Sequence, residues 1–380
     1  MIATAPMSLL HLRSSAGLYG ADKVVLSLNR ALVRQGVRSR LLTINNYRMT
    51  SQPLHEAALT YGDPATLLPC EGRLDWHTVK AIADEIRSNN ATILHVHDYK
   101  SACYGWLASR FRPVTLVATQ HGWIENSRSL KLYTQLELLL LKRFDALAVV
   151  SEQQVERLLR SGVPRERIHQ VDNGIDIRVA EPDYRERFRE EFSLPADAYV
   201  FGTVGRLSPE KNLAMLLDTF ALVARLRPHA FLFIVGDGEL RESLHAQVEM
   251  LGLRDRVVFT GARSDMPRIY AGIDCLVLPS LSEGMPLVVL EAMAAAIPVI
   301  ASAVGDVPRL LLNTDHGRLV PAGDAEALRI ELLGAATHPQ RRDVRAREQV
   351  LRHHSTAAMA DRYLDVYESL LRGQHGLEAA

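Results

Sequence analysis

The chain has few cysteines, no net charge and no Asp-x-Asp pair, and each of these absences narrows the classes of protein to which it can belong. Its three cysteines, Cys70, Cys103 and Cys275, are isolated and odd in number, so they are expected to be reduced thiols of a cytosolic protein. A formal charge of zero gives no support to generic nucleic-acid binding. Without an Asp-x-Asp pair, the sequence argues against a Mg²⁺ or Mn²⁺ ion held by carboxylates.

The sequence also lacks an apolar run of about 18 residues, the length that a transmembrane helix needs. Residues 7–12 are too short an apolar run for a secretory signal and lead directly into a glycine-containing turn. These absences predict a cytoplasmic protein, soluble or peripheral at the inner face of the cell membrane. The first 180 residues carry 22 Lys and Arg against 16 Asp and Glu. This excess favours an anionic acceptor or an anionic membrane surface, with unpatterned surface charge as the alternative.

Short apolar runs alternate with amphipathic segments along the chain, which predicts strands that alternate with helices. In the first half, strands are predicted at residues 9–12, 39–44, 93–96, 115–119, 146–150 and 168–171. Helices are predicted between them at residues 21–35, 76–89, 100–109, 131–143 and 152–161. The pattern then restarts, with strands predicted at residues 199–205, 231–235, 257–260, 275–278, 298–301 and 317–320.

This double alternation predicts an α/β fold with two Rossmann-like domains that face each other across a cleft. The predicted N-terminal domain is residues 1–177, followed by a connector at residues 178–195. The predicted C-terminal domain is residues 196–355. Residues 356–380 are predicted as a C-terminal helix and tail, and the helix could pack on either domain.

Two carboxylates, Glu283 and Glu291, lie eight positions apart across a predicted turn and the start of a helix predicted at residues 287–296. Glu283 is expected in the loop at the carboxyl end of a strand, where open α/β sheets bind ligands. The helix around Glu291 is apolar nearly all round, so this carboxylate needs a hydrogen-bond donor, and sugar hydroxyls are good donors. In the alternative interpretation, Glu283 only stabilises the helix N-terminus and Glu291 is solvated.

Two cations, Arg206 and Lys211, follow a glycine turn predicted at residues 202–205. Arg binds phosphate oxygens as a fork and Lys binds them as a point charge, so these residues and the carboxylates predict a site for a nucleoside diphosphate attached to a hydroxyl-rich group. A solvated surface pair is the alternative. The first half has its own turn at residues 17–20, which could meet an anion or only start a helix. Neither turn has the G-x-G-x-x-G spacing of a dinucleotide site.

Three histidines, His95, His97 and His121, lie in or directly after predicted strands and are candidate functional groups. His121 follows the strand at residues 115–119, a position that fits a ligand-binding edge, although a single histidine is more often structural. His95 and His97 alternate on one strand, but no third ligand is apparent near them in the sequence. No metal site is therefore predicted.

Residues 129–143 combine a leucine-rich face with cations, a composition found in helices that lie on membrane surfaces. A core helix whose charged residues face solvent explains the same pattern. We favour the core helix, and if the surface interpretation holds, the acceptor is expected to be linked to a lipid.

The motifs described above, taken together, resemble those of the retaining GT-B glycosyltransferases of family 4, and the resemblance covers nearly the whole chain. The matching segments are residues 17–23, His97-Asp98, Gln120-His121-Gly122-Trp123, Val150-Ser151, Asn173-Gly174-Ile175-Asp176, residues 205–212, Gly236-Asp237-Gly238, and Pro279-Ser280 leading to Glu283 and Glu291. Each motif alone is weak, but their order and spacing are specific.

The resemblance implies a role for each matching position. Arg206 and Lys211 would bind the diphosphate of a nucleotide sugar, and Glu291 would bind the ribose hydroxyls. Glu283 would lie against the transferred sugar, and His121 would lie near that sugar across the cleft. The implied catalytic residues are Glu283, His121, Arg206 and Lys211. The implied donor-binding residues are Gly17, Gly20, Gly205, Arg206, Lys211, Gly236, Glu283, Gly284, Met285, Pro286, Leu287 and Glu291, with no metal ligand among them.

The implied reaction moves a hexosyl group from a UDP- or GDP-linked donor to an acceptor hydroxyl, with retained anomeric configuration and without a metal ion. The implied setting is assembly of a cell-surface polysaccharide, a lipopolysaccharide or a glycolipid. No cofactor is implied besides the donor substrate, and the implied partner is a carbohydrate or lipid-linked acceptor rather than a nucleic acid. The alternatives are a GT-B nucleotide-sugar 2-epimerase and a non-catalytic protein that binds nucleotide sugars. The sequence specifies neither the sugar nor the acceptor.

Overall fold

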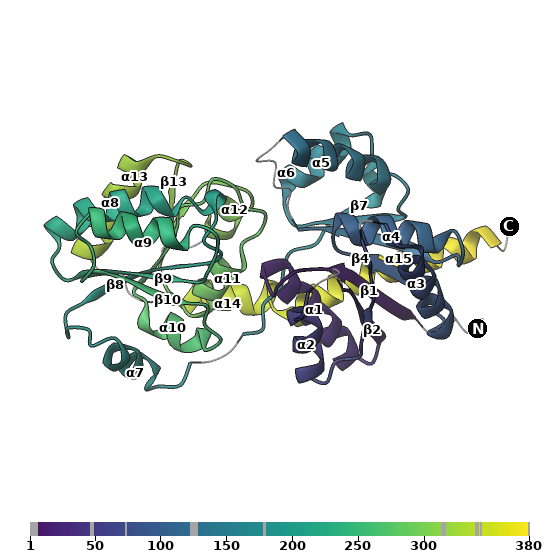
Figure 1. Ribbon diagram of the computed structural model, residues 1–380, viewed down its shortest axis with the longest axis horizontal. Coiled ribbons are helices and arrows are strands. Elements are labelled where there is room, and N and C mark those ends of the chain that lie inside the picture. The colour runs from purple at the N-terminus through teal and green to yellow at the C-terminus, as the bar shows by residue number, and fades with distance from the viewer. Residues whose placement is uncertain are drawn as a thin grey trace. The chain divides into compact units, whose positions relative to one another are not determined.

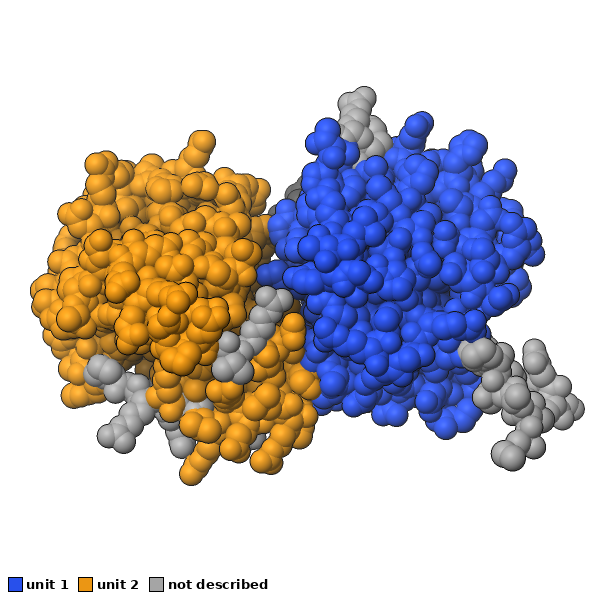
Figure 2. Space-filling model, turned by 90° about the horizontal axis from the view of Figure 1, so that it is seen from below, with its two compact units in different colours: residues 1–174, 356–380 blue, residues 175–355 orange. Residues whose placement is uncertain are grey.

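The chain forms two compact units, each built around one parallel sheet (Figures 1 and 2). The first unit is residues 1–174 and 356–380, and the second is residues 175–355. The structure is a computed structural model that describes residues 7–45, 49–72, 74–121, 128–177, 180–312, 317–338, 342 and 344–378. For residues 128–133 and 374–378 the description is of the backbone alone.

The first unit has seven parallel strands in the order β3-β2-β1-β4-β5-β6-β7. These strands are β1 Ser8–Ser14, β2 Arg38–Ile44, β3 Ala65–Leu68, β4 Ile93–Val96, β5 Thr115–Gln120, β6 Ala146–Val149 and β7 Ile168–Gln170. Its helices are α1 Gly20–Arg34, α2 Pro53–Thr60, α3 Trp76–Ser88, α4 Tyr99–Ser109, α5 Arg128–Leu141, α6 Glu152–Arg160, the short 3-10 helix η1 Arg165–Arg167, and α15 Thr356–Glu378. The strand order reverses between β1 and β4, which makes the carboxyl ends of these two strands the expected ligand-binding edge.

The second unit has six parallel strands in the order β10-β9-β8-β11-β12-β13. These strands are β8 Tyr199–Val204, β9 Ala230–Val235, β10 Val257–Gly261, β11 Cys275–Leu278, β12 Val299–Ser302 and β13 Gly317–Val320. Its helices are α7 Tyr184–Glu191, the 3-10 helix η2 Pro209–Lys211, α8 Leu213–Leu226, α9 Arg241–Met250, α10 Met266–Gly272, α11 Leu287–Ala294, α12 Val307–Leu311, α13 Ala325–Thr337 and α14 Val344–His353. Here the order reverses between β8 and β11.

The two faces of the first sheet carry different side chains because successive residues of a strand point to opposite faces. Leu10 and Leu94 belong to one apolar core with residues of α3 and α4. The intervening histidines, His11 and His95, lie on the other face, where α15 runs along the sheet (Figure 1). The last helix of the chain thus completes the first unit, and it covers a polar rather than an apolar part of that sheet.

The predicted fold class, two Rossmann-like domains with parallel sheets, is confirmed. Neither α2 nor β3 was predicted from the sequence. The strand β3 was missed because it is a short edge strand with only one buried residue and so lacks a continuous apolar run. Gly202 was expected in a turn but lies inside β8, where an added Cβ would come within 2.2 Å of the Ile273 side chain. Its role is close packing against the segment before β11.

Helix α5 covers the segment for which the sequence left a core helix and a membrane-surface helix open. Leu138 and Leu141 are buried in the core of the first unit, as a core helix requires. Leu136 and Leu139 on the same helix are 45% and 60% exposed, so the core accounts for only part of its leucine content. Among the described residues, no helix has both the length and the apolar character needed to cross a bilayer.

Candidate functional site

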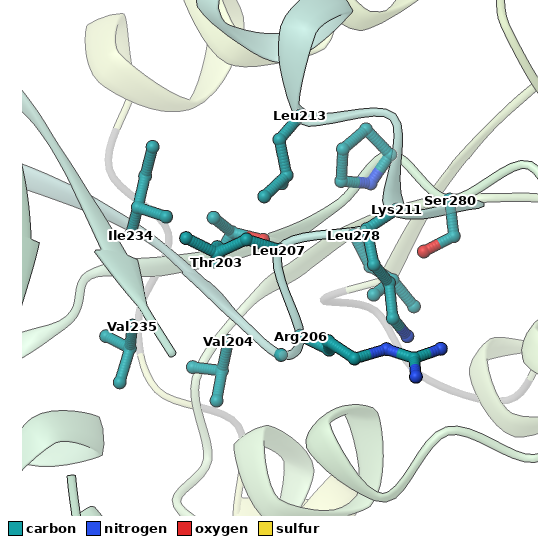
Figure 3. Close-up of a pocket in the computed structure, with 12 residues that line it drawn as sticks. Thr203, Val204, Arg206, Leu207, Lys211, Leu213, Ile234, Val235, Leu278 and Ser280 are labelled. Atoms are coloured by element: carbon teal, nitrogen blue, oxygen red, sulfur yellow. The ribbon is translucent and has the colours of Figure 1, made fainter. Parts of the chain in front are cut away.

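A pocket lies at the carboxyl ends of β8, β9 and β11, where the strand order of the second sheet reverses (Figure 3). The residues that line it include Gly205, Arg206 and Lys211 after β8, and Pro279 and Ser280 after β11. In Figure 3 the side chains of Arg206 and Lys211 extend toward the same side of the pocket. The two predicted cations therefore meet at one edge of the sheet.

Lys211 forms an ion pair with Glu283, a residue 72 positions later in the chain. Its Nζ lies 2.7 Å from Oε1 of Glu283, and the hydroxyl of Ser280 donates to the same oxygen at 2.6 Å. The side chains of Lys211 and Glu283 are only 21% and 10% exposed, so water screens this pair weakly. The pair connects the loops after β8 and β11, and it places a cation and a carboxylate at the same point of the pocket edge.

Arg206 is more exposed than Lys211 and is held by a local contact. Its Nη2 lies 2.8 Å from Oε1 of Glu210, which also accepts a hydrogen bond from the Ser208 hydroxyl at 2.7 Å. The Arg206 side chain is 42% exposed, so its guanidinium reaches solvent at the pocket edge. This arrangement holds the guanidinium at the edge of the pocket, close to Lys211.

The turn between Glu283 and α11 is fixed by backbone contacts with the segment that follows β12. The Asp306 N–H donates to the Gly284 carbonyl at 2.9 Å, and a Cβ on Gly305 would lie 2.3 Å from the Glu283 carbonyl oxygen. Met285 and Pro286 are buried, while Gly284 and Leu287 are half-buried. The turn is consequently rigid, and its accessible part is the backbone beside Glu283.

Glu291 lies in α11 and already has a donor within the protein. The Tyr270 hydroxyl, from α10, donates to Oε2 of Glu291 at 2.5 Å. Burial and the neighbouring carboxylate of Glu291 raise the pKa of Tyr270 well above its usual value, so this hydroxyl stays protonated and remains a donor. The expectation that a carboxylate in this apolar helix needs a partner is therefore met partly by Tyr270, which the sequence did not suggest.

Gly236 packs closely against the glycine loop that follows β8. A Cβ at this position would lie 1.9 Å from the Gly205 carbonyl oxygen, and the φ of Gly236 is +136°. Both observations require glycine, because any side chain would push the loop that carries Arg206 out of place.

Gly236→Ala is therefore expected to destabilise the second unit by about 2 kcal/mol and to weaken nucleotide binding. Gly334→Ala is the matched control, because Gly334 lies in α13 with no atom within 4 Å of an added Cβ. The control is expected to stabilise the protein by roughly 0.5–1 kcal/mol. Urea unfolding of both variants measures the difference, and wild-type stability of Gly236→Ala would contradict this account.

The glycine loop of the first unit, which contains Gly17 and Gly20, is held by the buried carboxylate of Asp22. Asp22 accepts hydrogen bonds from Arg13 Nε, the Ser15 hydroxyl and the Tyr19 N–H, each at 2.8 Å. Gly17 is buried, and a Cβ on it would come within 2.7 Å of the Tyr19 ring. Gly20 is exposed at the start of α1. The loop is thus held in place by the buried carboxylate of Asp22.

His121 lies directly after β5 and contacts another histidine. Its Nε2 lies 3.4 Å from Nδ1 of His97, which lies directly after β4. Burial, followed by the positive charge of Arg13, lowers the pKa of His121 to about 3. His121 is therefore neutral near pH 7 and acts there as a hydrogen-bonding group rather than a cation. Gly122 and Trp123, which share its motif, lie outside the described residues.

A third histidine lies beside His95 and His97, contrary to the sequence expectation that no further ligand is near. This residue is His11, on β1, and one ring nitrogen from each of the three histidines lies within 4.8 Å of the others. The sequence could not show this proximity because it depends on the pairing of His11 with His95 across adjacent strands. Both nitrogens of His95 already bond to hydroxyls, those of Tyr367 and Thr119, each at 2.7 Å. A metal ion there would have to break one of these bonds, so the donor set fits hydrogen bonding better than coordination.

The predicted site residues form two groups, one in each unit. The first unit holds Gly17, Gly20 and His121, and the second holds Gly205, Arg206, Lys211, Gly236, Glu283, Gly284, Met285, Pro286, Leu287 and Glu291. Within the second unit, the structure brings Lys211 to Glu283 and places Arg206 at the same pocket. The sequence gave no role to the supporting residues Ser280, Tyr270 and Asp22, although Ser280 and Asp22 belong to quoted motifs.

Comparison with known families accounts for both halves of the chain. Residues 19–179 match the family model of glycosyltransferase family 4, and residues 184–347 match that of glycosyl transferases group 1. Together the two models match most of the chain, which belongs to the glycosyltransferase families that they describe. This membership accounts for the feature that the two units share: in each parallel sheet, glycine loops and polar residues lie at the carboxyl ends of the strands.

Two curated relatives share 31% identity with this glycosyltransferase. One is the UDP-Gal:alpha-D-GlcNAc-diphosphoundecaprenol alpha-1,3-galactosyltransferase of Escherichia coli, matched over 64% of this chain and 65% of that enzyme. The other is the D-inositol 3-phosphate glycosyltransferase of Segniliparus rotundus, matched over 55% of this chain and 48% of that enzyme. The matches thus span less than two thirds of either relative's length.

A solved structure with the same fold is that of Anabaena Alr3699/HepE, in complex with UDP and glucose. It superposes with a TM-score of 0.85 at 20% identity, over 96% of this chain and all of that one. At this identity the likeness shows the fold alone.

Proposed function

We propose that this protein is a retaining glycosyltransferase that moves a sugar from a nucleoside-diphosphate donor to an acceptor hydroxyl. The observation that supports it most is the meeting of Lys211, Glu283 and Arg206 at one pocket of the second unit. A cation pair beside a carboxylate suits a diphosphate attached to a sugar, because the cations neutralise phosphate oxygens and the carboxylate accepts from hydroxyls.

In the proposed reaction the protein stabilises the leaving group and orients the two substrates. Arg206 and Lys211 hold the negative charge that develops on the departing phosphate, without a metal ion. Glu283 and the backbone of Gly284 to Leu287 position the transferred sugar, and Glu291 binds the ribose hydroxyls. From the first unit, the Gly17–Gly20 loop is proposed to contact the sugar and diphosphate, and His121 is proposed to offer a neutral ring nitrogen to the sugar.

Retention requires that the acceptor attack the face from which the phosphate leaves. In this same-face route the departing phosphate oxygen takes the proton of the acceptor hydroxyl, while the sugar passes through an oxocarbenium-like state. The new bond joins the acceptor oxygen to the anomeric carbon, the bond to the phosphate oxygen breaks, and the proton leaves with the nucleoside diphosphate. The carboxylates therefore position the donor, and no activated water is needed.

The proposed donor is a UDP sugar, with a GDP sugar as the second choice. The E. coli relative uses UDP-Gal by name, and the Anabaena neighbour was solved with UDP and glucose. The proposed acceptor is a carbohydrate or a lipid-linked sugar in cell-surface polysaccharide, lipopolysaccharide or glycolipid assembly, as the diphosphoundecaprenol-linked substrate of that relative suggests. The exposed Leu136 and Leu139 of α5 support peripheral membrane contact at the inner face, where such an acceptor would lie.

A thermal-shift screen tests the donor. A nucleotide sugar at about 100 times its Kd is expected to stabilise the protein by about 2.7 kcal/mol and to raise Tm by about 5 °C or more. UDP sugars are expected to give the largest rise, GDP sugars a smaller one and ADP sugars the least. An absence of any rise across the panel, at millimolar ligand, would contradict the proposed function.

The transfer step is tested with the donor that the screen identifies. Incubation with lipid-linked and free sugar acceptors is expected to release the nucleoside diphosphate and to give a product whose anomeric configuration, measured by NMR, matches that of the donor. An inverted product would contradict retention. Isomerisation of the donor without acceptor would indicate an epimerase, and calorimetric binding without transfer to any acceptor would indicate a binding protein.

A further inference from the structure

The first unit contains a row of three histidine rings behind the predicted sugar-facing position. Nδ1 of His11 lies 3.0 Å from Nε2 of His97, and Nδ1 of His97 lies 3.4 Å from Nε2 of His121. The ring planes are inclined by only 27° and 26° along the row. We name these three side chains the histidine file. His11 lies on β1, and His97 and His121 directly follow β4 and β5; these three strands are adjacent in the sheet.

Each ring in the file is neutral near pH 7. Burial lowers the pKa of His11 and of His121 to about 3, and it lowers the pKa of His97 well below its usual value. A neutral imidazole carries one proton, so one of its nitrogens donates and the other accepts. The file therefore consists of three rings, each with a defined donor side and acceptor side.

The tautomers of the three rings are coupled because His97 uses both of its nitrogens within the file. If His97 donates through Nδ1, then His121 accepts through Nε2 and carries its own proton on Nδ1, while His11 donates through Nδ1 to His97. If His97 donates through Nε2, every assignment reverses, and Nδ1 of His121 becomes an acceptor. The two arrangements differ at the ends of the file, which are Nε2 of His11 and Nδ1 of His121.

Both ends of the file are buried nitrogen atoms that lack a hydrogen-bond partner among the described residues. Nδ1 of His121 is therefore available to a ligand, since a buried polar nitrogen left unpaired is costly. His95 lies beside the file, with its ring centroid 4.0 Å from that of His97, but its nitrogens bond to Tyr367 and Thr119. It contributes packing to the file and no hydrogen bond.

We propose that His97 is a positioning residue for His121: with His11 it fixes which nitrogen of His121 carries the proton, and hence whether Nδ1 of His121 donates to or accepts from a sugar hydroxyl. The inference deepens the proposed function and rests on it in one respect, that His121 meets the donor sugar. A hydroxyl can donate or accept, so the tautomer of His121 decides which role the sugar hydroxyl takes toward it. A mixture of tautomers would leave the direction of that hydrogen bond, and with it the orientation of the hydroxyl, undefined.

The tautomer of His121 is measured without any substrate, in the full-length protein labelled with ¹⁵N-histidine, by long-range ¹H–¹⁵N correlation. Its signals are assigned by their loss in His121→Asn. Wild type is expected to show one neutral tautomer of His121, and His97→Phe is expected to change its Nε2 shift and to give a mixture of tautomers. His95→Gln is the matched control, on the same strand and equally buried, and is expected to leave the His121 tautomer unchanged.

Steady-state kinetics provides the second readout. His97→Phe is expected to lower kcat about tenfold with the donor KM within about twofold, because the ring of His121 remains present but its tautomer is mixed. His97→Gln, which keeps one donor and one acceptor, is expected to recover most of the loss. If His97→Phe does not fold, His11→Phe interrupts the same file one ring further from the sugar, and it is expected to change the tautomer in the same way.

Identical His121 nitrogen shifts in wild type and in the folded Phe variant would overturn the proposal. So would a stoichiometric metal ion in the purified protein, because the rings would then be ligands. Full activity of His121→Asn would also overturn it, by removing the link to the sugar, and would leave glycosyl transfer itself intact. A wild-type protein that transfers no sugar would instead count against the proposed function. The ¹H–¹⁵N spectra would still show whether the tautomers of His97 and His121 are coupled.

Discussion

Lys211→Ala and Glu283→Ala are each expected to lower the rate of sugar transfer at least 100-fold, a loss of about 2.7 kcal/mol of transition-state stabilisation. Lys211 supplies charge to the departing phosphate and also pairs with Glu283 at 2.7 Å. Removing the lysine therefore removes a phosphate cation and leaves a nearly buried carboxylate with Ser280 as its remaining partner among the described residues. Initial rates with the identified donor and acceptor measure the effect, and near-normal turnover of both folded variants would remove this active-site assignment.

A matched control is the ion pair between Arg254 and Glu249. Its atoms are also 2.7 Å apart and it lies in the same unit, but its side chains are 76% and 51% exposed. Exposed pairs contribute little, so Arg254→Ala is expected to retain full activity and stability within about 1 kcal/mol. Comparison with Lys211→Ala separates loss of a particular cation from loss of an ion pair in general.

The double variant Lys211→Ala with Glu283→Ala shows whether the two residues act as one unit. Residues in direct contact are rarely additive, so the double variant is expected to be little worse than the poorer single one. A loss equal to the product of the two single losses, about 10,000-fold, would mean that lysine and glutamate act on separate parts of the donor.

Lowering the pH from 7 to 5 is expected to destabilise the first unit by about 6 kcal/mol, about 2 kcal/mol for each of His11, His95 and His97. All three are fully buried, and burial lowers the pKa of each well below the ordinary 6.5. The unfolded chain therefore takes up protons below pH 6.5 while the folded unit does not. The stability that the three neutral histidines contribute to the first unit is fully present above pH 6.5 and falls continuously as the pH is lowered below that value.

The charged and titratable groups around these histidines do not offset the loss. Arg13 lies beside His97 and opposes its protonation, and the carboxylates of Asp22 and Asp98 are engaged with Arg13. Tyr363 and Tyr367 of α15 face the rings, and burial keeps their hydroxyls protonated by raising their pKa. No described carboxylate in this group is left to stabilise a buried imidazolium.

Hydrogen exchange of the β1 and β4 amides measures this loss within the first unit, which a whole-chain melting curve does not isolate. Replacing His95 by Gln is expected to reduce the pH slope by about one proton. Replacing His229, an exposed residue of the other unit, is expected to leave these amides unchanged. Protection that stays constant between pH 7 and pH 5 would show that the three histidines are not buried as described.

The sequence predicted strands well where the chain is apolar on both sides of a sheet. β4 and β11 have the predicted bounds, because a fully buried parallel strand is a continuous apolar run between turn residues. The edge strand β13 also has the predicted bounds, although only Val320 in it is buried. The short edge strand β3 was missed, since half-exposed residues such as those at its start leave no such run. The type of most elements therefore followed from the local pattern, and the exceptions were the short helix α2 and the edge strand β3.

Contacts between distant positions could not be predicted in the same way. The sequence identified Lys211 and Glu283 as members of one site but not as an ion pair, which depends on β8 and β11 being neighbours. It placed His95 and His97 on one strand but did not see His11, which is 84 residues from His95 and beside it only across the sheet. No local sequence pattern indicated that Tyr270 would be the partner of Glu291.

The first unit is completed by residues that are synthesised after the whole of the second unit. His95 Nδ1 bonds to Tyr367 of α15, which lies 272 positions later in the chain, and Thr119 bonds to Tyr363 of the same helix at 2.9 Å. During synthesis, residues 175–355 can fold as a unit before α15 leaves the ribosome, while the face of the first sheet that carries the histidines is still uncovered. The second unit is consequently expected to reach its native state first, and release of a chain shortened before Tyr363 would leave a folded second unit attached to an incomplete first one.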